Sequence, residues 1–336
     1  MPRSPRIPDE LRGRPFSVAQ ARAAGVSPRM LQGAAYRRVF PRVWVVRGHD
    51  LTPDDWVTAA RLTLPRDARL TGITRIQRLG LDHGPRFPMH FVVARDYHRA
   101  PDEIMLHRTD RMPVSDGEDV SPTAAFIAYC AVATAVDAIL VGDWLVREGQ
   151  MSVEGLVALA RHDHWRDGSP QAVWVAAYLD GRSWSPAESR IRSALVFAGL
   201  PCPESNVEIA DRGSVLAIVD LAYLRWNTVV EYEGRHHQTD RRQYLRDIER
   251  YGPLRDLGLR YVQVTKEHAS NLVTVVRRVH EALVKEGYDG PAPEFGERWR
   301  TLFQRLPAPP LQGAREVRQQ PYEGAEGSAG TYPKAG

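Results

Sequence analysis

Hydrophobic and polar positions between residues 185 and 286 follow two periodicities, which predict helices and strands in a defined order. Apolar residues recur at helical spacing after Ser185, again after Asp240, and over residues 269–285; Gly199 and Gly258 end the first two runs. Short runs rich in β-branched residues predict strands, at residues 207–209, 215–222, 228–232 and 259–264. The order α-β-β-β-α-β-α predicts an α/β fold for this part of the chain.

Three acidic residues lie on two of these strands, which a turn at residues 224–227 joins into an antiparallel hairpin. Asp220 and Glu231 would lie opposite each other, and Glu233 would point to the same face as Glu231 because side chains alternate along a strand. Val219, Leu221, Val230 and Tyr232 would face the packed side. Clustered carboxylates repel each other unless a cation neutralises them, and oxygen ligands suit Mg²⁺ or Mn²⁺. The hairpin therefore indicates a metal site, with a solvated strand face as the alternative.

The segments that carry this pattern are ESRIRSAL, VDLAY, VVEYEGRHH and DIERYGPLRDLGLRYVQVT. They resemble the PD-(D/E)xK nuclease core, and more narrowly a bacterial domain related to very-short-patch-repair endonucleases, over residues 185–286. The resemblance implies a restriction-endonuclease-like αβββαβ core and metal-dependent hydrolysis of DNA. It implies Asp220 and Glu231 as metal ligands, with Glu188 and His237 as auxiliary polar groups. Glu233 stands where the family motif has lysine, and it could act as a general base or a further ligand.

Several of these residues also have a purely structural interpretation. Glu188 is placed to close a capping box with Ser185 at the start of a helix. His237 could lie in the turn before the next helix. Arg190 and Arg241 could bind phosphate, or they could pair with nearby acids on exposed helix faces.

The first 50 residues hold ten arginines, no lysine and three acids, a net charge of +7 against +4 for the whole chain. A basic segment of this kind indicates a polyanionic partner. Capping patterns at Ser17 and at Ser27-Pro28 predict two short helices around Gly25, as in a helix-turn-helix, and residues 38–46 predict the strands of a wing. The expected DNA contacts are Arg29, Gln32 and Arg37 from the second helix, and Arg38 and Arg42 at the wing.

Residues 11–46, with RVFPRVWVV at their end, resemble the N-terminal winged helix of the AbiEi-type antitoxin family. The resemblance implies DNA binding and is compatible with a toxin partner. A competing function for the chain is therefore a non-catalytic, antitoxin-like regulator that keeps the nuclease fold without its activity. A small helical cap with solvated arginines is the structural alternative for residues 1–50.

The middle of the chain predicts a mixed α/β extension at residues 51–120, followed by a helical region at residues 121–180. Within the extension, TGIT at residues 71–74 and LGL at residues 79–81 loosely resemble the antitoxin-like domain. Helices are expected at residues 56–64 and 74–79, and strands at 89–93 and 104–107. His162, His164 and Trp165 are typical of an exposed helix end, although they also allow a metal site or a base-stacking surface. The Pro- and Gly-rich residues 307–336 predict a disordered tail.

Composition narrows the class of protein. A chain of 336 residues with 43% hydrophobic and 26% charged residues is globular and long enough for two or three domains. Cys130 and Cys202 are the only cysteines, which argues against a disulfide framework or a structural zinc site. The most apolar run, residues 124–136, is too short to span a membrane, and the N-terminus lacks the apolar core of a signal peptide. We therefore expect a cytoplasmic protein with no membrane partner.

Overall fold

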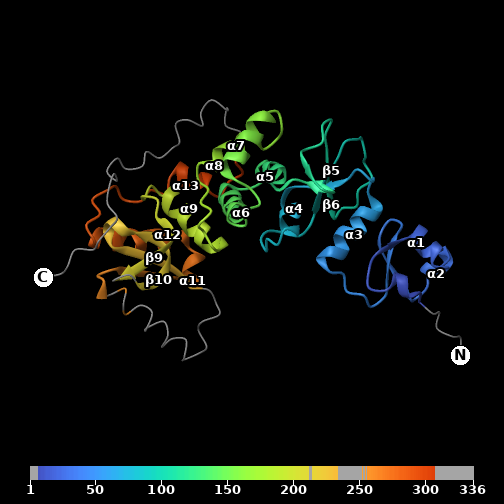
Figure 1. Ribbon diagram of the computed structural model, residues 1–336, viewed down its shortest axis with the longest axis horizontal. Helices are drawn as coiled ribbons and strands as arrows, with labels where there is room; N and C mark the ends of the chain where they lie inside the picture. The colour runs from blue at the N-terminus through green and yellow to red at the C-terminus, as the bar shows by residue number, and fades with distance from the viewer. Residues whose placement is uncertain (1–6, 212–213, 234–251, 253, 255, 307–336) are drawn as a thin grey trace.

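The computed structural model describes residues 7–211, 214–233, 252, 254, 256–306, and shows a mixed α/β chain with several small sheets (Figure 1). The N-terminal helices lie at one end of the molecule, and the sheet that contains β9 and β10 lies at the other. Among these residues, the helices are all too short or too polar to cross a membrane.

The N-terminal unit places two short helices between the first and second strands of an antiparallel sheet ordered β1-β3-β2. The hydroxyls of Ser17 and Ser27 accept hydrogen bonds from the backbone N–H of Gln20 and Met30, as the capping patterns predicted. The elements are η1 (Asp9–Leu11), β1 (Phe16–Ser17), α1 (Val18–Ala23), α2 (Pro28–Leu31), β2 (Tyr36–Phe40) and β3 (Val43–Val46).

The second unit follows with a helix whose apolar side packs against the β2–β3 hairpin. Phe40 and Val43 share a core with Val57 and Phe91, so the hairpin and the second unit are packed together. Both expected helices and both expected strands are present. The elements are α3 (Pro53–Thr63), β4 (Arg69–Leu70), α4 (Gly72–Arg78), β5 (Met89–Val93), β6 (Ile104–Arg108), β7 (Ser115–Asp116) and β8 (Asp119–Val120).

Helices α5 (Pro122–Cys130), α6 (Ala135–Arg147), α7 (Val153–His162) and α8 (Ser169–Ala176) form the helical region expected after residue 121. Three of them begin with a hydroxyl cap, at Ser121, Thr134 and Ser152. Their core is continuous with that of the C-terminal unit, because Ile139 and Leu195 belong to the same buried cluster.

Within the described residues, the C-terminal unit shows the predicted first helix, the four predicted strands and a helix after the last strand, with the sheet ordered β12-β11-β10-β9. β11 and β12 are parallel, and the other neighbouring strands are antiparallel. The first strand is longer than expected, and Asn271 divides the last helix in two. The elements are α9 (Pro186–Phe197), β9 (Glu204–Asp211), β10 (Ser214–Tyr223), η2 (Leu224–Trp226), β11 (Thr228–Glu233), β12 (Arg260–Thr265), α11 (Lys266–Ala269), α12 (Leu272–Lys285) and α13 (Glu297–Thr301).

Two cores lie on the two faces of this sheet. Leu221 and Val230 pack into the large core that includes α9 and α12. Val219 and Val229 pack into a smaller core with Leu254 and Leu259. The predicted helix at residues 240–257 and the predicted tail at 307–336 fall largely or wholly outside the described residues.

Candidate functional site

The register of the β10–β11 hairpin places Asp220 opposite Glu231. Leu221 pairs with Val230 and Ala222 with Val229, and one further step in this register joins the two acids. Ala222 and Val229 belong to the smaller core, and by alternation along β11 Glu231 shares the face of Val229. Residues directly opposite on antiparallel strands have Cβ atoms about 5 Å apart.

The alternation of side chains between the two faces of the sheet is interrupted in β10 beside Asp220. Val219 packs in the smaller core, whereas Leu221, two residues later, packs in the larger one. The prediction that Val219 and Leu221 share a face is therefore wrong. The register with β9 places Asn206 next to Asp220, and Asn206 has a left-handed φ of 48°.

The side chain of Asp220 forms a hydrogen bond with the backbone of the neighbouring strand β11. One carboxylate oxygen, Oδ2, accepts a hydrogen bond of 2.7 Å from the backbone N–H of Tyr232. Glu231 is buried, with 5% of its surface exposed, and Glu233 is half-buried at the end of β11. The hydrogen bond fixes the orientation of the Asp220 carboxylate relative to β11.

The three carboxylates do not gather into one cluster. Within the described residues, no group of three His, Cys, Asp or Glu side chains is arranged to hold a metal ion. The expected convergence of Asp220, Glu231 and Glu233 on a metal-binding arrangement is therefore not observed, and the Asp220 carboxylate bonds to the backbone of Tyr232. What remains is an opposed pair, Asp220 and Glu231. Mg²⁺ sites are commonly built from one or two carboxylates with several waters, so the pair has suitable donor chemistry.

Glu188 serves as a helix cap and also connects α9 to the sheet. Its backbone N–H donates to the Ser185 hydroxyl at 3.2 Å, and its Oε2 accepts from the backbone N–H of Trp184 at 2.8 Å. The same oxygen accepts from the side-chain amide of Asn206 at 2.7 Å. Glu188 thus holds the residue that lies beside Asp220, a contact that the capping pattern alone did not reveal.

Positive side chains line a groove next to β11. The groove has a volume of about 560 Å³ and lies between α6, α9 and α11, with Arg190, Lys266 and the side chain of Tyr232 in its lining. Lys266 directly follows Thr265, which pairs with Glu233 in the parallel ladder. Sequence analysis identified Arg190 but missed Lys266. The available signal was that Lys266 is one of only three lysines in the chain and lies two residues after the predicted strand at 259–264.

A histidine and an aspartate at the edge of this groove bind each other. His83 Nε2 lies 3.1 Å from Asp137 Oδ1, and the Thr134 hydroxyl donates to Asp137 at 2.6 Å. The hydrogen bond with His83, together with that from Thr134, lowers the pKa of Asp137 despite its burial. The carboxylate therefore stays charged, which offsets part of the positive charge of the groove.

The N-terminal arginines lie at the opposite end of the molecule (Figure 1). Arg29 on α2, Gln32 at its C-terminus, Arg38 on β2 and Arg42 in the β2–β3 turn are all exposed. Arg37 does not project from the second helix as predicted, because α2 ends at Leu31 and Arg37 lies on β2. Its guanidinium donates to the carbonyl of His49 at 3.0 Å. His237 and Arg241 lie outside the described residues.

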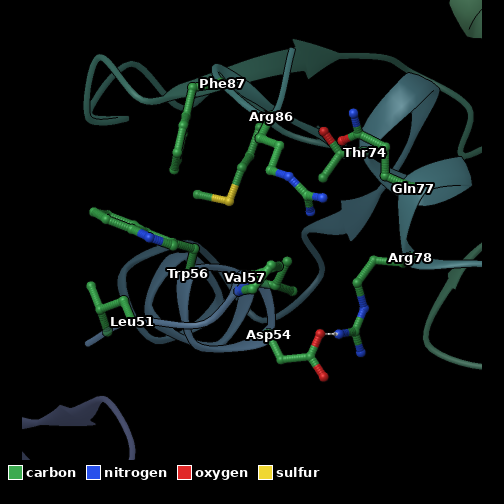
Figure 2. Close-up of a pocket in the computed structure, with 11 residues that line it drawn as sticks. Leu51, Asp54, Trp56, Val57, Thr74, Gln77, Arg78, Arg86 and Phe87 are labelled. Carbon is green, nitrogen blue, oxygen red and sulfur yellow. Dashed lines mark hydrogen bonds and ion pairs between the residues drawn. The ribbon is translucent and has the colours of Figure 1, made fainter. Parts of the chain in front are cut away.

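A smaller pocket of about 240 Å³ lies between α3 and α4, and its polar groups serve the fold (Figure 2). Trp56 and Phe87 form an edge-to-face wall, with ring centroids 5.1 Å apart. Arg78 is bound to Asp54, as the dashed line in Figure 2 shows. The Thr74 hydroxyl accepts from the backbone N–H of His90. Since these polar groups already have hydrogen-bond partners within the protein, the pocket gives no indication of a polar ligand.

Comparison with known proteins gives little functional information. No family model and no solved structure matches the chain. Two uncharacterized proteins, from two strains of Mycobacterium tuberculosis, are each 30% identical over 119 residues. The match covers 35% of this chain and 43% of the relatives' own length, so the chain spans less than half of the curated relatives that it matches.

Proposed function

We propose that the chain is a metal-dependent endonuclease that hydrolyses DNA phosphodiester bonds, with a PD-(D/E)xK-like domain at residues 185–286. The observation that carries the proposal is the pair Asp220 and Glu231, which the register of the β10–β11 hairpin places opposite each other. The element order around the hairpin supports the same proposal, with α9 before the sheet and α12 after it.

Asp220 and Glu231 would hold Mg²⁺ or Mn²⁺, which suits two carboxylates in a site without thiolate ligands. Bound there, the cation would supply Lewis-acid stabilisation of the phosphate and a more acidic water. The hydrogen bond from Tyr232 keeps the Asp220 carboxylate in a fixed orientation, so less conformational entropy is lost when the cation binds. Glu231 is buried and its position is set by the packed sheet.

The remaining groups would act on the DNA itself. Arg190 and Lys266 line one groove and would bind backbone phosphates, Arg190 through a planar guanidinium and Lys266 as a point charge. Glu233, half-buried at the end of β11, would accept a proton from the attacking water. Roles for His237 in proton donation and for Arg241 in phosphate binding rest on the sequence alone.

The second candidate function is a non-catalytic, antitoxin-like DNA-binding regulator with a toxin partner. The net charge of +7 in residues 1–50 favours it, together with the glutamate at the position of the family lysine. Two helices between β1 and β2, followed by the β2–β3 hairpin, support a winged helix as the DNA-binding unit of either function. Both functions are consistent with a cytoplasmic location, which we propose for the chain.

Incubation of the purified full chain with supercoiled plasmid distinguishes the two functions. A nuclease nicks or linearises the plasmid with Mg²⁺ or Mn²⁺, and EDTA or the substitution Asp220→Asn abolishes this. Glu208→Gln is the matched control, because Glu208 is an exposed acid on β9 of the same sheet. Binding of the plasmid without metal-dependent cleavage by the wild type would favour the regulator.

A further inference from the structure

A second, larger groove lies apart from the hairpin. It has a volume of about 890 Å³ and is bounded by β6 with the loop that follows it, by α5, and by the loop between α7 and α8. One wall is apolar and is formed by Ile127 and Ala128 of α5 together with Ala131 and Val132, which directly follow that helix. The opposite side carries aromatic and charged residues, among them Trp165, Arg111 and Arg166.

Trp165 is held at the rim of this groove with 44% of its surface exposed. The guanidinium carbon of Arg166 lies 4.2 Å from its ring centroid, and that of Arg111 lies 5.5 Å away. Arg166 is itself fixed, because it donates to the Asp163 carboxylate at 2.6 Å and to the Met112 carbonyl at 3.1 Å. The rim is therefore held in place by contacts within the protein.

Gly168 keeps the same loop close to α5. It has a φ of 91°, and a Cβ added there would lie 1.9 Å from the carbonyl oxygen of Ile127. Only glycine allows this approach. The loop that carries Trp165 thus lies directly against the helix that forms the apolar wall.

Two polar atoms in the lining of the groove are unsatisfied. Thr71 is 2% exposed and Gln171 is 8% exposed, both line the groove, and neither Thr71 Oγ1 nor Gln171 Oε1 has a hydrogen-bond partner among the described residues. Thr71 occupies the N-cap position of α4, where a hydroxyl normally accepts a backbone N–H, but it makes no such bond. Buried polar atoms without partners reduce stability, and each such atom in a native structure calls for a physical explanation.

We propose that this groove binds a nucleotide. The base would lie between Trp165 and the apolar wall of α5, with its hydrogen-bonding edge toward Thr71 and Gln171, and a phosphate would bind Arg111. Base stacking on an aromatic side chain with a nearby cation is the recurrent mode of single-strand recognition. This site is separate from the hairpin carboxylates, so the inference goes beyond the proposed nuclease activity and does not depend on it.

Arg111 is the arginine of the groove that is available to an anion. It forms no ion pair with any residue that the structure describes, whereas Arg108 binds Asp96 and Arg166 binds Asp163. Asp110 and Asp167 also line the groove and would repel a phosphate elsewhere, which directs it toward Arg111. A purely apolar ligand would leave Thr71 and Gln171 unsatisfied, and a simple anion would not use the α5 wall.

The test uses the full chain in EDTA, so that metal-dependent cleavage cannot contribute. Binding of fluorescein-labelled oligo(dT) is followed by anisotropy, and binding of deoxyadenosine monophosphate by calorimetry. Trp165→Ala and Arg111→Gln should each weaken binding about tenfold. Both residues are exposed, so these variants are expected to fold. Arg161→Gln removes an exposed arginine of α7 outside the groove and should leave the affinity within about twofold.

Thr71→Val and Gln171→Met separate ligand binding from a structural role. Each should weaken binding about fivefold, while the Tm stays constant or rises because the removed polar group had no partner to lose. A structural role would lower the Tm and leave the affinity unchanged. Binding of the mononucleotide identifies a pocket for a free nucleotide, and binding of oligo(dT) alone identifies a site for a strand.

The proposal is overturned if neither probe binds the wild type, or if the groove variants bind both probes as the wild type does. Glu208→Gln should bind both probes as the wild type does, because Glu208 lies outside the groove and outside the proposed metal site. A chain that binds nucleotide but never cleaves plasmid would refute the nuclease proposal and leave this one intact, so the two can fail separately.

Discussion

The guanidinium of Arg192 on α9 lies 2.8 Å from the carboxylate of Asp143 on α6, and both side chains are almost completely buried, at 5% and 1% exposed. Asp143 also accepts the backbone N–H of Asp180 at 2.6 Å, and Arg192 donates to the carbonyl of Tyr178 at 2.9 Å. Burial raises the pKa of Asp143, and the charge of Arg192 opposes that shift. The bridge therefore connects the helical middle region to the helix that begins the proposed nuclease domain.

Removal of one partner of this bridge should be costly. Arg192→Ala leaves the Asp143 carboxylate buried without its counter-charge, and we expect a loss of about 3–5 kcal/mol in the free energy of unfolding. The double variant Arg192→Met with Asp143→Leu should recover most of it, because two apolar side chains replace two buried charges. Urea denaturation followed by circular dichroism measures both.

The matched control is Arg182→Ala. Arg182 and Asp180 are 3.6 Å apart, and the Arg182 side chain is 61% exposed, so the change should cost less than about 1 kcal/mol. If Arg192→Ala were no more destabilising than this control, the buried bridge would not be what holds the two regions together.

The stacked pair His90 and His107 should make stability depend on pH. The ring nitrogens His90 Nδ1 and His107 Nε2 lie 3.0 Å apart, and burial together with the neighbouring His107 lowers the pKa of His90 to about 4. An unfolded histidine binds its proton near pH 6.5, so acid favours the unfolded chain. The stability is full above about pH 6.5 and falls by up to about 3 kcal/mol as the pH drops toward 4.

Urea midpoints measured across this pH range test the expectation. His90→Phe should flatten the pH dependence, whereas His162→Gln should preserve it because the His162 side chain is 80% exposed. An unchanged slope in His90→Phe would assign the acid sensitivity to other groups.

The bond between Glu188 and Asn206 should couple the start of α9 to the sheet. Glu188→Ala removes the acceptor for Trp184 and Asn206, which should cost about 1–2 kcal/mol of stability. Asn206→Gly should be tolerated better than Asn206→Ala, because the φ of 48° favours glycine. A double-mutant cycle with Glu188→Ala and Asn206→Ala should give a coupling of at least about 0.5 kcal/mol. Additive effects would mean that the bond contributes nothing.

Local sequence signals predicted most elements because each signal acts over a few residues. Ser185 predicted the start of α9 and Gly258 the end of the helical run before β12, and both depend on capping or left-handed backbone within one turn. The β10–β11 register likewise followed from a short turn and alternating side chains.

Features that depend on distant residues could not be predicted in the same way. The position of Lys266 next to the end of β11 requires the parallel β11–β12 pairing of Thr265 with Glu233, which joins segments far apart in sequence. Thr71 and Gln171 are brought to one groove only by tertiary packing. The change of facing between Val219 and Leu221 departs from the strict alternation on which the prediction was based.

The salt dependence of DNA binding by the full chain tests the N-terminal arginines. Arg38→Gln and Arg42→Gly each remove an exposed charge, and the second also suits the φ of 65° at Arg42. If both residues contact phosphate, the slope of log K against log salt should become shallower by about 0.9 for each variant, with a similar loss of affinity for all sequences. Anisotropy of a labelled DNA duplex in EDTA at several salt concentrations gives the slope.

Arg37→Gln is the control for this measurement. Its guanidinium is bound to the His49 carbonyl, so its loss should lower stability and leave the slope unchanged. Arg29→Ala or Gln32→Ala should instead alter sequence preference if α2 enters the major groove, because contacts with base edges carry sequence information and phosphate contacts do not. Unaltered slopes for both Arg38→Gln and Arg42→Gly would show that the β2–β3 hairpin does not contact the DNA backbone.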